Sequence, residues 1–461
     1  MTTSVDVSSG QRTPAPAPRR AGWRSRLDTA TTPARLRLLL VALVLLSLAW
    51  GVLAALTADQ HASAAADVVA VSEPLSLDAE QIYTSLSDAD ATAASAFLAG
   101  GLEPAAARQR YQADITEAAI RIEAASALVG SSAARAELPG HLANQASAAG
   151  SAVGDDLAML SGQLPAYTDE VGTARADNRL GLPLGAAYLR EASALLRGTL
   201  LPAASDIYTR ESALLTSSSA QATGLPLMVI AVIAGLGLGY VLYRSSRWLS
   251  RHTHRVVNYG LLLAALAGLI SLVWLAGSFV AGRGDLLHAQ QQGSGPAQAF
   301  ARAEVAALRA HADESLTLID NSGDDSYQKD YLAQQKLLGP GPGTLLAQVQ
   351  AAAATGDGQA GDVVAEARAW YQAHAALRAK DDAGNHGDAV RSALTGDAAT
   401  SFARLSDTLN EGIETHQAVF AASARGGRDA FTGLAVGMIV ASLVMVAACT
   451  WGLSRRLAEY R

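Results

Sequence analysis

The stretch that decides the fold is residues 38–58, LLLVALVLLSLAWGVLAALTA, in which 21 consecutive residues carry no charge. A helix needs about 20 apolar residues to cross the hydrocarbon core of a bilayer, and it satisfies its own backbone hydrogen bonds there. Three further uncharged stretches are of similar length: residues 225–243, 256–282 and 430–454. The sequence therefore predicts four transmembrane helices.

Composition supports this prediction. Of the 461 residues, 50% are hydrophobic and only 17% are charged, whereas charged residues make up about a quarter of an ordinary globular domain. Long segments of the chain must therefore lie out of water, and an ordinary soluble enzyme is excluded.

The charges outside the four stretches predict the orientation. Residues 1–37, 244–255 and 455–461 together carry 14 Arg and only three acidic residues. The two long segments, 59–224 and 283–429, carry 9 and 12 basic residues against 20 and 19 acidic ones. Because basic residues near membrane spans are retained in the cytoplasm, we expect a multi-pass protein of the plasma membrane with both termini in the cytoplasm and two acidic domains outside.

An internal repeat relates the two halves of the chain. Residues 45–50, LLSLAW, return as LISLVW at residues 269–274, and residues 88–92, DADAT, face HADES at residues 311–315 at nearly the same offset. The repeated unit is a span, an ectodomain and a second span. This pattern predicts a tandem duplication, such as is seen in some transporters.

Both ectodomains have helical character, since Ala, Leu, Glu and Arg dominate and few β-branched or aromatic runs alternate with period two. The predicted fold class is an all-α membrane protein with two extracytoplasmic domains resembling four-helix bundles. Helix breaks are expected at Pro74, Gly100–Gly101, Pro165, Pro183 and residues 339–343. The Ala-rich faces predict closely spaced helices with little room for an enclosed ligand cavity. Residues 1–37 form a basic tail that we expect to be disordered.

Two groups of residues are candidates for functional contacts. The loop 244–255 is densely basic, so we expect its arginines to contact anionic lipid headgroups or a cytoplasmic protein; they are Arg244, Arg247, Arg251 and Arg255. The spans carry small residues at four-residue spacing, which allows close helix packing in lipid. The glycines predicted to pack in this way are Gly51, Gly235, Gly239, Gly260, Gly268, Gly433 and Gly437.

The ectodomain arginines offer a third possibility, direct binding of a carboxylate ligand. The candidates are Arg108, Arg110, Arg121, Arg175, Arg179 and Arg190. Ion pairs on helix surfaces explain these residues equally well. The sequence contains no phosphate loop, nucleophile motif or zinc spacing, and the cytoplasmic segments are too short to fold a catalytic domain. We therefore expect no enzyme activity, no cofactor, no metal and no nucleic-acid partner.

The overall layout resembles the GlnX-type membrane proteins of actinobacteria. The stretches that carry the resemblance are residues 86–94 with the following Gly100–Gly101, residues 110–115 (RYQADI) and the closing residues 455–461 (RRLAEYR). The resemblance implies a relay in amino-acid sensing. In that relay a solute-binding lipoprotein of the GlnH type reports aspartate or glutamate, and the signal reaches a soluble Ser/Thr protein kinase of the PknG type.

The favoured hypothesis is thus a non-enzymatic transmembrane signal transducer that acts through these two partners and membrane lipids. Two alternatives stay open. One is a structural scaffold or accessory subunit of envelope or transport machinery, and the other is a direct, chemoreceptor-like ligand sensor. The oligomeric state is left open by the sequence.

Overall fold

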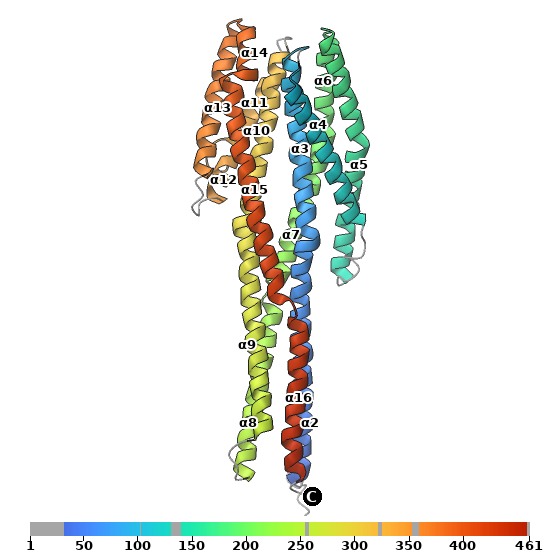
Figure 1. The fold of residues 1–461 in the computed structure, drawn as a ribbon, viewed down its shortest axis with the longest axis vertical. Helices are drawn as coiled ribbons and strands as arrows, with labels where there is room; N and C mark the ends of the chain where they lie inside the picture. Colours follow the sequence, from blue (N-terminus) through green and yellow to red (C-terminus); the bar gives the residue numbers. More distant parts are fainter. Residues whose placement is uncertain are drawn as a thin grey trace, which may run out of the picture. The chain divides into compact units, whose positions relative to one another are not determined.

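The computed structural model of the protein describes residues 32–101, 103–130, 140–253, 258–320, 325–352 and 359–458. All regular elements in these ranges are helices, and four of the helices are long and apolar enough to cross a membrane (Figure 1). The all-α fold class is thereby confirmed. Residues 1–31, most of the tail expected to be disordered, lie outside the described residues.

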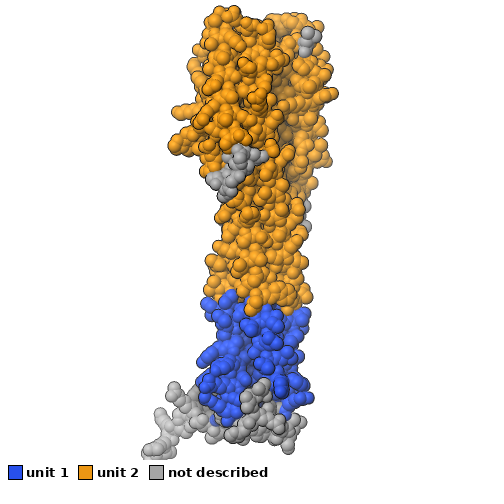
Figure 2. Space-filling model, turned by 60° about the vertical axis from the view of Figure 1, so that its left-hand side comes forward, with its two compact units in different colours: residues 1–53, 232–272, 438–461 blue, residues 54–231, 273–437 orange. Residues whose placement is uncertain are grey.

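Four helices cover most of the four uncharged stretches. They are α2 (Thr32–Asp67), α8 (Pro226–Thr253), α9 (Tyr259–His288) and α16 (Leu434–Ala458). The chain divides into two compact units, coloured separately in Figure 2. Unit 1 comprises residues 1–53, 232–272 and 438–461, and unit 2 comprises residues 54–231 and 273–437.

Small residues let the helices of unit 1 approach closely. Gly51 of α2 faces the side chain of Ser442 of α16, and the Ser442 hydroxyl donates a hydrogen bond of 3.0 Å to the carbonyl oxygen of Ser47. The ring of Trp50 covers Gly235 of α8, where an added Cβ would lie 2.8 Å from the nearest ring atom. Because lipid provides little hydrophobic drive, helices in a membrane associate through contacts and hydrogen bonds of this kind.

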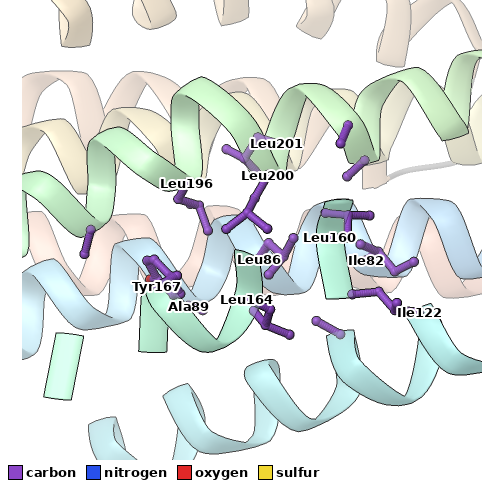
Figure 3. Packing of buried hydrophobic residues seen from close by; sticks show 14 of the residues in the cluster. Ile82, Leu86, Ala89, Ile122, Leu160, Leu164, Tyr167, Leu196, Leu200 and Leu201 are labelled. Carbon is purple, nitrogen blue, oxygen red and sulfur yellow. The ribbon is translucent and has the colours of Figure 1, made fainter. Parts of the chain in front are cut away.

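Unit 2 contains two helical bundles. Bundle 1 consists of α3 (Glu73–Leu98), α4 (Ala105–Gly130), α5 (Gly140–Arg179), α6 (Leu184–Leu195) and α7 (Leu201–Ala222). Its core is aliphatic, and Figure 3 shows Ile82 and Leu86 of α3 together with Leu160 and Leu164 of α5. Tyr167 is fully buried in the same core.

Bundle 2 consists of α10 (Gly295–Ile319), α11 (Ser326–Leu338), α12 (Leu345–Ala352), α13 (Gln359–Asp382), α14 (His386–Thr395) and α15 (Asp397–Phe431). Its core is more aromatic than that of bundle 1. Phe300, Tyr331 and Trp370 are fully buried there, and the rings of Tyr331 and Trp370 meet edge to face at a centroid distance of 5.7 Å.

The two bundles pack against each other through α3 and α10. Ala91 of α3 is buried in the core cluster of bundle 2, and Leu316 of α10 is buried in that of bundle 1. The helices that meet are the ones that carry the repeated sequences at residues 88–92 and 311–315. The interface between the bundles is therefore part of one continuous, well-packed unit.

In the part of the chain that the structure describes, three π-helical turns interrupt the long helices, and each is followed by a proline. They are η1 (Val68–Ser72) before Pro74, η3 (Leu196–Leu200) before Pro202, and η4 (Ala289–Ser294) before Pro296. Proline cannot donate to the carbonyl four residues earlier, and π turns often accommodate such interruptions. The carbonyl four residues before Pro296 is that of Gln292, which accepts a hydrogen bond of 2.7 Å from Nδ1 of His416.

Two of the expected helix breaks are wrong. The helix continues from α2 through η1 into α3 across Pro74, and Pro165 lies inside α5. Leu164 and Tyr167 beside Pro165 are buried in the core, so packing outweighs the lost backbone hydrogen bond. Other breaks are confirmed. Gly100 follows α3 with a φ of 73°, which suits glycine after a helix end, and the chain leaves helix between α11 and α12.

Candidate ligand cleft and signalling surfaces

A partly enclosed cleft of about 520 Å³ lies between the two bundles. One wall comes from α3 and the start of α4, and the other from α14 and α15, with His311 of α10 also lining it. Alanines form much of the surface, among them Ala91, Ala107, Ala399 and Ala403. The sequence predicted little room for an enclosed cavity because the helices within a bundle pack closely. The cleft lies between the two bundles, where that argument does not apply.

Arg110 and Asp88 are the charged pair of bundle 1 in this cleft. Nε of Arg110 donates to Oδ2 of Asp88 over 2.9 Å, and the hydroxyl of Thr92 lies 3.4 Å from Oδ1 of the same carboxylate. The Arg110 side chain keeps 53% of its surface exposed, against 18% for Asp88. No hydrogen bond joins its two Nη groups to another residue in the described part of the chain.

The other arginines considered as carboxylate clamps do not line the cleft. Arg108 and Arg175 pair with Glu103, Arg121 pairs with Asp78 and Glu117, and Arg190 pairs with Asp320. Arg179 donates to the carbonyl oxygen of Arg175. Ion pairing thus accounts for four of the other five candidates, and of the six only Arg110 lines the cleft.

Two further acids lie close to this pair. Burial raises the pKa of Asp114 to about 7, with the Asp88 carboxylate acting in the same direction and Arg110 opposing it. Burial also raises the pKa of Glu304 to about 8, although the Ser406 hydroxyl donates to its carboxylate over 2.6 Å. Near neutral pH both groups therefore hold protons for a substantial part of the time.

Bundle 2 contributes an aromatic and acidic wall. The imidazole of His311 stacks on Phe402 at a centroid distance of 3.9 Å, and its Nδ1 lies 3.5 Å from Oε1 of the fully buried Glu314. Burial raises the pKa of Glu314, but hydrogen bonds from His311 and His374 outweigh burial and lower it to about 2. This glutamate is therefore ionised at any physiological pH.

A buried ion cluster joins the bundles elsewhere at the same interface. Arg197 of η3 pairs with Asp90 of α3 at 3.3 Å and with Asp313 of α10, while Ser193 donates to Asp90 over 2.9 Å. Burial raises the pKa of Asp313 to about 6, with Arg197 acting in the opposite direction. The two aspartates occupy matching positions of the sequence repeat, so one arginine holds equivalent residues of both bundles.

Most of these groups were not expected from the sequence. Arg110 was among the candidates, and the repeat had drawn attention to residues 88–92 and 311–315. Glu304 and Phe402 gave no local signal, because their role depends on how two bundles pack. Among the described residues, no group of three or more His, Cys, Asp or Glu is arranged to hold a metal ion.

The basic residues of the connecting loop lie at the end of α8. Arg244, Arg247 and Arg251 are exposed, and none of the three pairs with an acid that the structure describes. Nη1 of Arg247 donates to the hydroxyl of Tyr243 over 2.9 Å. Arg255 lies outside the described residues. The three described guanidinium groups are thus accessible to a partner or to lipid.

The seven glycines of the spans differ in their surroundings. In unit 1, four of these glycines face an atom of a neighbouring helix: Gly51, Gly235, Gly260 and Gly268. The facing atom belongs to Gly452 in the case of Gly260, and it is the sulfur of Met445 in the case of Gly268. In unit 2, Gly437 faces the ring of Trp274. An added Cβ at Gly239 or Gly433 would meet nothing within 4 Å, and the φ of 73° at Gly433 indicates a turn.

A comparison with protein families places part of the chain near a known sensor domain. Residues 64–220, which cover bundle 1 and the turn that precedes it, match the model of an actinobacterial sensor domain. No curated protein and no solved structure matches the chain. The match fits a sensor-type actinobacterial protein and indicates a sensing or signalling role, and the four apolar helices together with this domain are consistent with a multi-pass membrane protein.

Proposed function

We propose that the protein is a non-enzymatic transmembrane signal transducer. It relays the extracytoplasmic availability of aspartate or glutamate, reported by a solute-binding lipoprotein, to a cytoplasmic Ser/Thr protein kinase. Both termini and the loop 244–255 face the cytoplasm, and the two bundles face outward. The lipoprotein contacts the bundles, and the kinase contacts the basic end of α8.

The observation that carries the proposal is the sensor-domain match over residues 64–220. The matched segment begins within α2, the helix that contains the first uncharged stretch, and continues without a break into α3. A rigid helix is able to transmit a shift from one end to the other. In this proposal, a cytoplasmic partner reads the output of such a shift.

The interface between the bundles supports a switching role. It buries Asp90, Asp313 and Arg197 together with the protonatable Glu304, instead of aliphatic residues alone. Replacing buried ion pairs by apolar residues often leaves stability unchanged or raises it, so such an interface is not optimised for stability alone. A partner that prefers one packing of the bundles then shifts the population toward that packing.

Charge reversal tests the cytoplasmic contact. A variant with Arg244, Arg247, Arg251 and Arg255 replaced by Glu is expected to lose most of its kinase recruitment in a pull-down from membranes, since four attractive charges become repulsive. The control is Arg391→Glu, which reverses an exposed arginine of bundle 2. If the quadruple variant retains the kinase at unchanged affinity, the assignment of this surface is wrong.

The relay itself is tested with the full chain in nanodiscs, the lipoprotein and the kinase. Adding aspartate or glutamate is expected to change kinase recruitment only when the lipoprotein is present. A scaffold, the alternative from a different class, predicts the same recruitment with and without the amino acid. Equal recruitment in both conditions would refute the relay and favour the scaffold.

A further inference from the structure

We propose that the cleft between the bundles binds a zwitterionic amino acid with an apolar side chain directly, without a partner protein. The inference goes beyond the relay, because there the lipoprotein holds the ligand. The space fits, since 520 Å³ lies within the usual range of small-molecule sites, roughly 300–1,000 Å³.

Arg110 provides the contact for the ligand's carboxylate. A guanidinium carries five N–H donors in a fixed fork, and the pair with Asp88 uses only Nε. The Nη groups have no other described partner, and the side chain is half exposed toward the cleft. Asp88 holds the guanidinium in place without occupying the edge that binds a carboxylate in a bidentate manner.

Asp407 provides the contact for the ligand's ammonium group. It lines the opposite wall on α15, is exposed, and has no hydrogen bond or ion pair with any residue that the structure describes. A cation in the cleft faces Asp407 and Asp88 at once, and the only arginine there is Arg110. A dicarboxylate such as glutamate brings a second negative charge to a lining that already has an excess of acid, so the cleft selects against it.

The remaining surface suits an apolar side chain. Leu394, Phe402 and several alanines line the cleft, and Phe402 is kept in place by its stack on His311. Burial of one aliphatic side chain of the ligand contributes about 1.5–3 kcal/mol in such surroundings. The cleft therefore has one contact of each sign and an apolar wall, which is the chemistry of a neutral amino acid.

A ligand bound in this way touches both bundles. Arg110 belongs to bundle 1, whereas Asp407 and Phe402 belong to bundle 2. The ligand consequently binds best to the arrangement that brings these residues to the right separation, and it stabilises that arrangement over others. The cleft is placed where a small molecule could bias the contact between the bundles.

The test is isothermal calorimetry on the full chain in nanodiscs, without lipoprotein. L-leucine and L-valine are expected to bind, whereas L-aspartate and L-glutamate, and leucinol, which lacks the carboxylate, bind at least about tenfold more weakly. Arg110→Gln should weaken L-leucine binding about 10–100-fold, the range for a lost charged hydrogen bond, and should leave leucinol binding unchanged. Asp407→Asn should weaken both ligands.

Two control variants keep the test specific. Arg108→Gln removes an arginine two positions away on α4 that pairs with Glu103 outside the cleft, and Glu411→Gln removes an exposed acid one turn beyond Asp407. Both should bind L-leucine as the wild type does. The proposal is overturned if no neutral amino acid binds, if the dicarboxylic amino acids bind as tightly, or if the control variants lose affinity as much as Arg110→Gln. None of these outcomes affects the lipoprotein-dependent relay, which has its own readout in kinase recruitment.

Discussion

Replacing Glu304 by Gln should make the protein less sensitive to pH. Glu304 of α10 is fully buried, accepts hydrogen bonds from Ser406 and Asn410 of α15, and is influenced by Asp88 of α3 and Arg110 of α4. Burial raises its pKa from 4.5 to about 8. The folded state therefore binds this proton more tightly than the unfolded state does.

The sign and the size of the effect follow from that difference. Because the folded-state pKa lies above the unfolded one, the stabilisation is fully present below about pH 4.5 and is lost as the pH rises toward 8. Each unit of pKa difference corresponds to about 1.4 kcal/mol. Between about pH 5 and pH 8, Glu304 should cost the fold on the order of 3 kcal/mol, whereas a glutamine, which does not titrate, costs nothing over that range.

The assay is thermal unfolding of the full chain in detergent, followed by tryptophan emission, to which Trp370, fully buried in bundle 2, contributes. At about 2–4 °C per kcal/mol, the fall in Tm from pH 5 to pH 8 should be smaller by roughly 6–12 °C in Glu304→Gln than in the wild type. Comparing the two proteins cancels the contributions of the other titratable groups. Glu411→Gln, at an exposed position of α15, should follow the wild type. Equal pH slopes for Glu304→Gln and the wild type would show that this glutamate is not protonated in the fold.

Two further predictions concern the ion cluster and the π-helical turns. Arg197→Met should destabilise the protein by about 3–5 kcal/mol, because Asp90 and Asp313 are left buried without their cation; the triple variant in which both aspartates also become Asn should recover most of the loss in the same melting assay. Gly293→Ala in η4 should lower the Tm, since the new Cβ would lie 2.6 Å from Cα of Phe420, whereas Gly198→Ala in η3, with no atom within 4 Å, should leave it unchanged or raise it.

The spans and the helical class could be predicted because both depend on local properties. A run of about 20 uncharged residues identifies a membrane helix whatever surrounds it. Proline was a less reliable guide. Pro74 and Pro165 were expected to end helices, yet η1 accommodates the first and core packing of Leu164 and Tyr167 retains the second. The cost of a proline within a helix is about 3 kcal/mol, which is comparable to what two buried side chains contribute.

The cleft could not be predicted, because none of its chemistry is local. Arg110 resembles the other ectodomain arginines in sequence, and only its place in the cleft that α3 and α4 form with α14 and α15 distinguishes it. Asp407 likewise has no motif around it. What the sequence did contain was the repeat, which relates Asp88 to His311 and Asp90 to Asp313. In the structure Asp88 and His311 both line the cleft. Corresponding positions of the repeat therefore contribute a carboxylate from bundle 1 and an imidazole from bundle 2.

The ion cluster shows how two bundles with equivalent residues form an asymmetric interface. Packing equivalent helices against each other brings the equivalent carboxylates of Asp90 and Asp313 together, and two buried carboxylates repel unless a cation lies between them. Arg197 supplies that cation from η3 of bundle 1, and its side chain is 15% exposed. A shift of the helix that contains η3 therefore changes the contact with both aspartates at once. A signal that moves α6 and α7 therefore alters this contact, so Arg197 is one of the links between the sensor-domain segment and the second bundle.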